Sequence, residues 1–197
     1  MMMQHSHGQC TPKRMEDIIY KLYSHNPPHL FKQNAKYFVT GATYLKKKFL
    51  IHPESKLQIL YSITKGCKKY DWLLEDWVIL DNHYHLMLQS PKSVETMPNL
   101  FNEIHKFTAI WLKRNAPTLR NEGKIFYNYW DTCITYEKSY FARLNYIYFN
   151  PVKHGYVERA EDYMFGSYYY RVKNEKRYLD EIKERYPWDK VNVKDSF

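Results

Sequence analysis

The feature that most limits the fold of this chain is a pair of apolar segments, residues 72–80 and 83–89, separated only by Asp81-Asn82. Each segment has the length and the residue types of a β-strand. A polar connection of two residues is typical of a tight β-hairpin. We therefore expect two neighbouring antiparallel strands at the centre of the fold.

The rest of the chain adds two strands and three helices around this hairpin. β-Branched and aromatic residues predict strands at residues 35–44 and near 129–136. Apolar residues at helical spacing predict helices at 53–66, 93–115 and 137–149. Proline is tolerated at a helix start and disrupts a helix interior, so Pro53 is expected to open the first helix and Pro151 to stop the last.

The apolar positions of the first two helices indicate which face each would bury. In the first helix they are Leu57, Leu60, Tyr61 and Thr64, with Gly66 closing the helix. In the second they are Leu100, Ile104, Phe107 and Trp111.

The resulting order, βαββαβα, indicates an α+β fold of the ferredoxin-like type. In this βαββαβ sandwich, helices cover one face of an antiparallel sheet, and the chain adds one further helix. Residues 1–34 are an N-terminal extension that contains a helix-like piece at 14–23. Residues 35–171 form the main domain, and 172–197 a charged tail with a surface helix at 174–185.

Composition narrows the class of partner. The 197 residues hold 30 Lys and Arg against 21 Asp and Glu, a net charge of +9, and include 20 Tyr and 5 Trp. Positive charge attracts phosphate polymers, and exposed aromatic rings stack on unpaired bases. Nucleic-acid binding is one interpretation, and a basic protein with an aromatic core is the other.

Other classes of protein are disfavoured. No apolar run approaches the roughly 20 residues that span a bilayer, and the N-terminus lacks the apolar segment of a signal peptide. Three widely spaced cysteines do not suit a disulfide scaffold or a four-ligand zinc site. We expect a soluble cytoplasmic protein, associated with the nucleoid if it binds DNA.

The segment LDNHYHLML, residues 80–88, contains the first candidate for chemistry. Alternate residues of a strand share a face, so His83 and His85 are expected to point the same way, about 7 Å apart. Tyr84, Leu86 and Leu88 then face the core. Two adjacent imidazoles can chelate a divalent cation. Ordinary histidines on a sheet surface are the alternative.

The segment NYIYFNPVKHG, residues 145–155, contains the second candidate. Tyr146 and Asn150 are four residues apart and would share one face of a helix, whereas Tyr148 lies on another. Core packing near a helix end is the alternative. Combined with the histidines, these residues suggest a reaction. A cation held by His83, His85 and the Asn150 amide would polarise a phosphate, and the Tyr146 hydroxyl would attack it.

WVILDNHYHLML at 77–88, followed about sixty residues later by YIYFNPVKHGYV at 146–157, resembles the REP-associated tyrosine transposases. These belong to the single-tyrosine HUH superfamily, named for two histidines that flank a hydrophobic residue, here Tyr84. The segments YFVTGATY, IHKFTA and YMFGSYYY at 37–44, 104–109 and 163–170 extend the resemblance over residues 26–171.

The resemblance implies a transposase that cleaves and rejoins single-stranded DNA next to hairpins through a 5′-phosphotyrosine. Tyr146 would be the nucleophile, and His83, His85 and Asn150 would bind Mg²⁺ or Mn²⁺. The expected partner is single-stranded DNA with a hairpin, bound by a monomer or a homodimer.

Basic residues near the predicted ends of elements are candidate DNA contacts, since phosphates attract exposed lysine and arginine. They are Lys47, Lys48, Lys153 and Arg171. The alternative to an enzyme is a non-catalytic ferredoxin-like module that binds single-stranded nucleic acid on its tyrosines.

Overall fold

A computed structural model describes residues 19–21, 29–189 and 191 of the chain. Its main sheet contains β3 (Lys36–Thr43), β4 (Leu73–Ile79), β5 (His83–Gln89) and β6 (Phe126–Ile134). The strand order is β4-β5-β3-β6, and all neighbours are antiparallel. This is the order of a ferredoxin-like sheet, so the predicted fold is confirmed.

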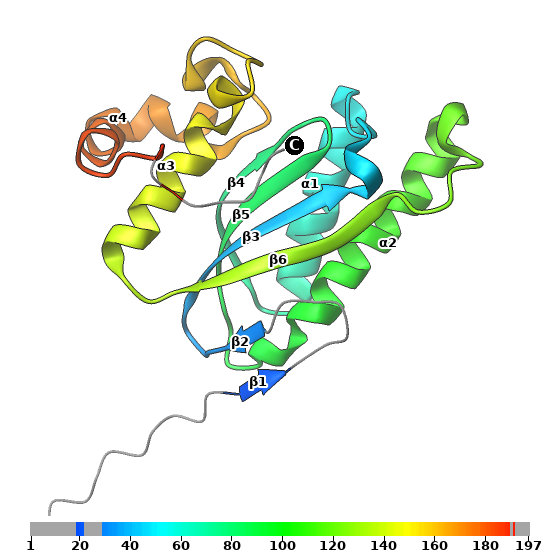
Figure 1. Ribbon diagram of the computed structural model, residues 1–197, viewed down its shortest axis with the longest axis horizontal. Coiled ribbons are helices and arrows are strands. Elements are labelled where there is room, and N and C mark those ends of the chain that lie inside the picture. The colour runs from blue at the N-terminus through cyan, green and yellow to red at the C-terminus, as the bar shows by residue number, and fades with distance from the viewer. Residues whose placement is uncertain (1–18, 22–28, 190, 192–197) are drawn as a thin grey trace, which may run out of the picture.

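Four helices cover the sheet, two on each face (Figure 1). The first face carries α1 (Pro53–Lys69) and α2 (Met97–Asn115), and the second carries α3 (Glu137–Lys153) and α4 (Ser167–Arg185). Short 3-10 helices lie between the elements at Tyr44–Lys46, Val94–Thr96, Pro117–Leu119 and Ala160–Asp162. None of the described helices is long and apolar enough to cross a bilayer.

Strand alternation divides the interior into two apolar cores. Tyr84, Leu86 and Leu88 are fully buried in the core beneath α1 and α2, as the alternation predicts. Met87 points to the other face and packs in the core formed with α3 and α4. Because helices cover both faces, β5 is buried along nearly its whole length and provides a rigid central strand.

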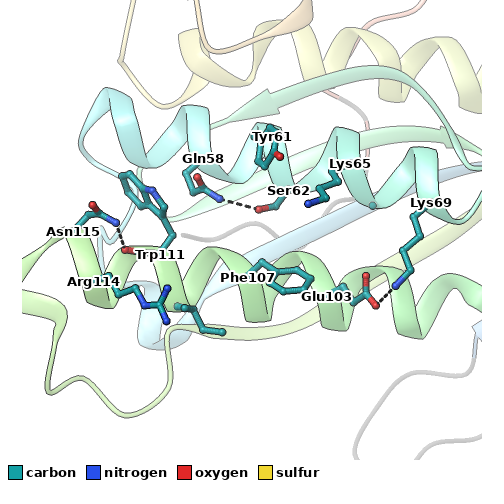
Figure 2. Close-up of a pocket in the computed structure, with 12 residues that line it drawn as sticks. Gln58, Tyr61, Ser62, Lys65, Lys69, Glu103, Phe107, Trp111, Arg114 and Asn115 are labelled. Carbon is teal, nitrogen blue, oxygen red and sulfur yellow. Dashed lines mark hydrogen bonds and ion pairs between the residues drawn. The ribbon is translucent and has the colours of Figure 1, made fainter.

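The predicted buried face of α1 is wrong. Leu57 and Tyr61 are 54% and 58% exposed, whereas the fully buried Ile59 and Ile63 form the stripe that faces the sheet. Phe107 of α2, predicted to be buried, is also 52% exposed. Tyr61 and Phe107 line an outer groove of about 540 Å³ between the two helices (Figure 2). These two side chains therefore lie in the groove between the helices and do not pack against the sheet.

Two predicted helix ends are also wrong. α1 continues past Gly66, where a Cβ atom would lie 2.8 Å from Leu100, so this glycine permits close packing of the two helices. α3 continues through Pro151 to Lys153. A proline removes only its own N–H donor, and the next turn still closes through the bond from His154 N–H to the Asn150 carbonyl. Asn150 therefore keeps helical geometry.

The two ends of the chain differ in part from the prediction. Ile19–Lys21 (β1) pairs with His29–Phe31 (β2), so these residues of the predicted helix 14–23 form a strand, while 14–18 and 22–23 lie outside the described residues. The predicted helix 174–185 belongs to the longer α4, whose Leu179 and Ile182 are buried in the second core. The domain boundaries after residues 34 and 171 stay predictions.

Gly41 of β3 gives a prediction about stability. A Cβ atom there would lie 2.2 Å from Cζ of Tyr84, which is fully buried and hydrogen-bonds to His105 through its hydroxyl at 2.8 Å. Gly41→Ala is therefore expected to lower the free energy of unfolding by about 1–3 kcal/mol, measured by urea denaturation. Gly123→Ala is the control, because no atom lies within 4 Å of its Cβ position. Equal losses of unfolding free energy in the two variants would contradict the close approach of Gly41 to the Tyr84 ring.

Candidate active site

The central strand β5 presents His83 and His85 to the face covered by α3. Their ring centroids are 5.1 Å apart. Nδ1 of His83 hydrogen-bonds with Oδ1 of Asn82 at 2.7 Å, and Nδ1 of His85 with Oγ1 of Thr40 at 2.8 Å. Because such bonds fix the ring orientation, Nε2 of each ring is the atom through which a cation would be bound.

The last turns of α3 bring the predicted tyrosine and asparagine to these histidines. The ring centroid of Tyr146 lies 5.3 Å from that of His85. The side chain of Asn150 lies within hydrogen-bonding reach of His83. Phe38 of β3 stacks on His85 at 5.3 Å and contacts the edge of Tyr146 at 6.1 Å. The structure therefore brings all four predicted residues together in one buried cluster.

Two further side chains of the α3 end belong to this cluster. The exposed Lys153 donates a hydrogen bond from Nζ to Oη of Tyr146 at 3.0 Å, and Nζ lies 4.7 Å from the centroid of the tyrosine ring. The ring of His154 lies 5.0 Å from that of His83. Neither contact was predicted, although the sequence contains a signal. Lys153 follows Tyr146 by seven residues and His154 follows Asn150 by four, which are same-face spacings on a helix.

Tyr148 has a different environment from Tyr146. Its hydroxyl donates to the buried carboxylate of Asp76 at 3.0 Å and accepts from Arg171 at 2.7 Å. Burial and the nearby charge of Asp76 raise the pKa of Tyr148 well above its usual value. This phenol holds α3 to β4 and α4, and it is poorly suited to lose its proton.

The predicted DNA contacts lie in different settings. Arg171 forms ion pairs with Asp76 and Glu175, both at 2.6 Å, which anchor α4. Lys47 pairs with Glu122 at 2.9 Å, and Lys48 is exposed. The segment that carries Lys47 and Lys48 lies near the histidines, because the carbonyl of the preceding residue accepts a bond from the Asn82 amide. Contacts of these residues with DNA stay predictions.

Burial and nearby positive groups favour the neutral form of both histidines. Burial, with the nearby His154 and Lys153, lowers the pKa of His83 to about 3, and burial lowers the pKa of His85 well below its usual range. A neutral imidazole is the form that binds a metal ion. No group of three or more His, Cys, Asp or Glu side chains that could hold a metal ion occurs within the described part of the chain. The candidate metal ligands proposed from the sequence are of a different kind, because they are two imidazoles and one amide.

A third buried histidine, His105, predicts acid sensitivity. Burial, with Lys124 nearby, lowers its pKa from 6.5 to about 3. As the pH falls below 6.5, the unfolded chain takes up a proton that the folded chain does not, so stability is lost downward from 6.5. Between about pH 7 and pH 5, His105→Gln should therefore lose about 2 kcal/mol less unfolding free energy than the wild type. Urea denaturation in EDTA measures the unfolding free energy of both proteins at each pH. The same loss of stability with falling pH in the wild type and in His105→Gln would contradict this prediction.

A ferredoxin-like fold with a tyrosine beside two histidines is the arrangement that the resemblance to single-tyrosine transposases implies. Comparisons with known proteins agree with this fold and this class of protein. A family model described as "Transposase IS200 like" matches residues 32–148, more than half of the chain. The protein therefore belongs to the IS200-like transposase family.

Two curated relatives and one solved structure refine this result. The REP-associated tyrosine transposase of Escherichia coli K12 is 27% identical over 68% of this chain and 81% of its own length. A relative of the same type from Haemophilus influenzae is 28% identical over 74% and 86%. A REP-associated tyrosine transposase solved with a REP hairpin shares the fold, with a TM-score of 0.63, 21% identity and coverage of 93% and 95%. The predicted resemblance is confirmed.

Proposed function

We propose that this transposase cleaves and rejoins single-stranded DNA next to hairpins through a covalent 5′-phosphotyrosine at Tyr146. The observation that carries the proposal is the contact of Tyr146 with His85, 5.3 Å between ring centroids, beside a second buried histidine. Family membership supports DNA as the substrate. The hairpin bound by the relative of known structure supports the choice of hairpin DNA.

In the proposed reaction the phenol oxygen of Tyr146 attacks the scissile phosphorus. A bond forms between this oxygen and phosphorus, and the bond from phosphorus to the 3′ oxygen of the other fragment breaks. The phenol loses its proton and the departing 3′ oxygen gains one, so protons balance. Lys153, which donates to the phenol oxygen, would stabilise the negative charge that develops there. Attack by a 3′-hydroxyl on the phosphotyrosine reverses the step and joins the strands.

We further propose that His83, His85 and Asn150 bind Mg²⁺ or Mn²⁺. Three features support this: burial lowers the pKa of both imidazoles and so favours their neutral form, their Nδ1 atoms are engaged, and the Asn150 side chain lies beside His83. Imidazole and amide oxygen are ligands that such cations accept. When bound, the cation would act as a Lewis acid on the scissile phosphate.

The test uses a labelled hairpin oligonucleotide with single-stranded flanks, incubated with the full chain and Mn²⁺. We expect a covalent protein–DNA adduct on a denaturing gel, lost in EDTA. His83→Ala should lower the cleavage rate by at least about 100-fold while the affinity for the hairpin changes little, because the cation acts mainly on the reacting phosphate. His52→Ala, which alters an exposed histidine at the start of α1, is the control. Tight binding without adduct formation would favour the non-catalytic alternative.

A further inference from the structure

Three aromatic side chains at one edge of the main sheet form a stacked row outside both cores. The rings of Tyr44 and Tyr127 are 6.4 Å apart and inclined by 21°, and those of Tyr127 and Trp130 are 5.5 Å apart and inclined by 19°. Tyr127 and Trp130 are 43% and 38% exposed. The three rings are thus nearly parallel, and the two on β6 present much of their surface to water.

Strand register places this row on the face of the sheet that carries the candidate active site. Trp130 of β6 pairs with Thr40 of β3, and Thr40 pairs with His85 of β5. Directly paired residues point to the same face, so Trp130 and His85 share a face two strand spacings apart, about 10 Å. Figure 1 shows β6 at one edge of the sheet and α3 near the other edge.

Positive charge accompanies the aromatic row. Nζ of Lys124 lies 5.5 Å from the ring centroid of Tyr44 and 5.0 Å from that of Tyr127. Three exposed lysines, residues 46–48, follow Tyr44 within four positions, and Lys47 among them is paired with Glu122. The neighbouring acidic residue on the strand, Asp131, points to the opposite face, because adjacent strand residues alternate. The row therefore combines apolar ring faces with cations. The carboxylate next to Trp130 in the strand, that of Asp131, lies on the other face of the sheet.

We propose that Tyr44, Tyr127 and Trp130 form a stacking platform for unpaired bases of single-stranded DNA, with Lys124 contacting the phosphates. Every base offers a flat face for an aromatic ring, and lysines track the backbone. Because Trp130 lies two strand spacings, about 10 Å, from His85, a base stacked on it would belong to a nucleotide a few positions from the phosphate that Tyr146 attacks. The position of these nucleotides relative to Tyr146 rests on the proposed function, whereas the binding of single strands to the platform does not.

The test measures the affinity of the full chain for a fluorescein-labelled strand of about 12 thymidines and for a blunt duplex of equal length. Trp130→Ala and Tyr127→Ala should each weaken binding of the single strand by about 5- to 150-fold and leave duplex binding unchanged. Trp130→Phe should restore most of the affinity, since it keeps a ring. Circular dichroism checks that each variant is folded.

Tyr61→Ala is the matched control. Tyr61 is 58% exposed and has a lysine, Lys65, 5.8 Å from its ring centroid, but it lies in the α1/α2 groove on the other face of the sheet (Figure 2). Its loss should leave single-strand affinity unchanged. The proposal is overturned if Trp130→Ala and Tyr127→Ala bind the strand normally, or if duplex binding falls equally. It is also overturned if Trp130→Ala only converts a dimer to a monomer in sedimentation, because a second copy would then cover the row.

The same experiments separate this inference from the proposed catalysis. If the wild type forms the covalent adduct but Trp130→Ala and Tyr127→Ala bind the single strand normally, the platform is wrong and the catalytic proposal stands. If the wild type forms no adduct but the platform variants lose affinity for the strand, the platform stands and the catalytic proposal is wrong.

Discussion

Tyr146→Phe is expected to abolish the covalent protein–DNA adduct and to leave hairpin binding within a few-fold of the wild type. The substitution removes only the hydroxyl, the proposed attacking atom, and keeps the ring that packs against Phe38 and His85. Loss of the hydrogen bond from Lys153 should cost only about 0.5–1.5 kcal/mol of stability. A denaturing gel reports the adduct, and fluorescence anisotropy reports binding.

Tyr148→Phe is the matched control two residues away. Its hydroxyl contacts Asp76 and Arg171 rather than the histidines, so this variant should lose stability but still form the adduct. The assignment fails if Tyr146→Phe forms the adduct at the wild-type level, or if a folded Tyr148→Phe cannot form it.

The burial of Tyr146 is compatible with attack on DNA. The residue is only 2% exposed, but its hydroxyl is hydrogen-bonded by Lys153, an exposed side chain with several rotatable bonds. A phosphate that binds to the lysine ammonium would lie next to the phenol, so the same cation would bring the substrate to the nucleophile and stay within reach of the phenol oxygen.

Lys56→Ala is expected to lower the free energy of unfolding by about 3–5 kcal/mol. Nζ of Lys56 donates to Oδ1 of Asp81 at 2.6 Å and to the carbonyls of Leu50 and Ile51 at 2.8 and 3.1 Å. The two charged side chains are only 5% and 9% exposed, so removal of the lysine leaves a buried carboxylate without its cation. Asp81 begins the turn before His83, which means that the same change should disturb the active site.

Urea denaturation measures this effect, with two comparisons. Lys69→Ala removes a solvent-exposed pair with Glu103 and should change stability little. Lys56→Met combined with Asp81→Asn should recover part of the loss, because no unpaired charge remains. Similar stabilities of Lys56→Ala and Lys69→Ala would contradict a structural role for the buried pair.

The parts of the site that depend on local periodicity could be predicted from the sequence. The common orientation of His83 and His85 follows from the two-residue repeat of a strand. The shared face of Tyr146 and Asn150 follows from the helical repeat, and it persists because Pro151 interrupts only one bond in the last turn of α3. The ferredoxin-like topology follows from the order of elements with a tight central hairpin.

The parts that depend on pairing between distant segments could not be predicted. The bond of Thr40 to His85 and the stacking of Phe38 on the same ring require the register of β3 against β5, which no local pattern specifies. The apolar stripe of α1 was wrong for a related reason. Leu57 and Tyr61 are four residues apart, and so are Ile59 and Ile63, so two apolar stripes have helical spacing. Only the packing against α2 and the sheet decides which stripe is buried.

The most direct test of the account is to locate the amino acid that becomes linked to DNA. The wild-type adduct is digested with nuclease and trypsin, and the peptide that carries a nucleotide is sequenced by mass spectrometry. We predict the tryptic peptide of residues 144–153, with the phosphate on Tyr146 and not on Tyr148. A phosphate on Tyr148 or on any other residue of the chain would contradict the proposed mechanism.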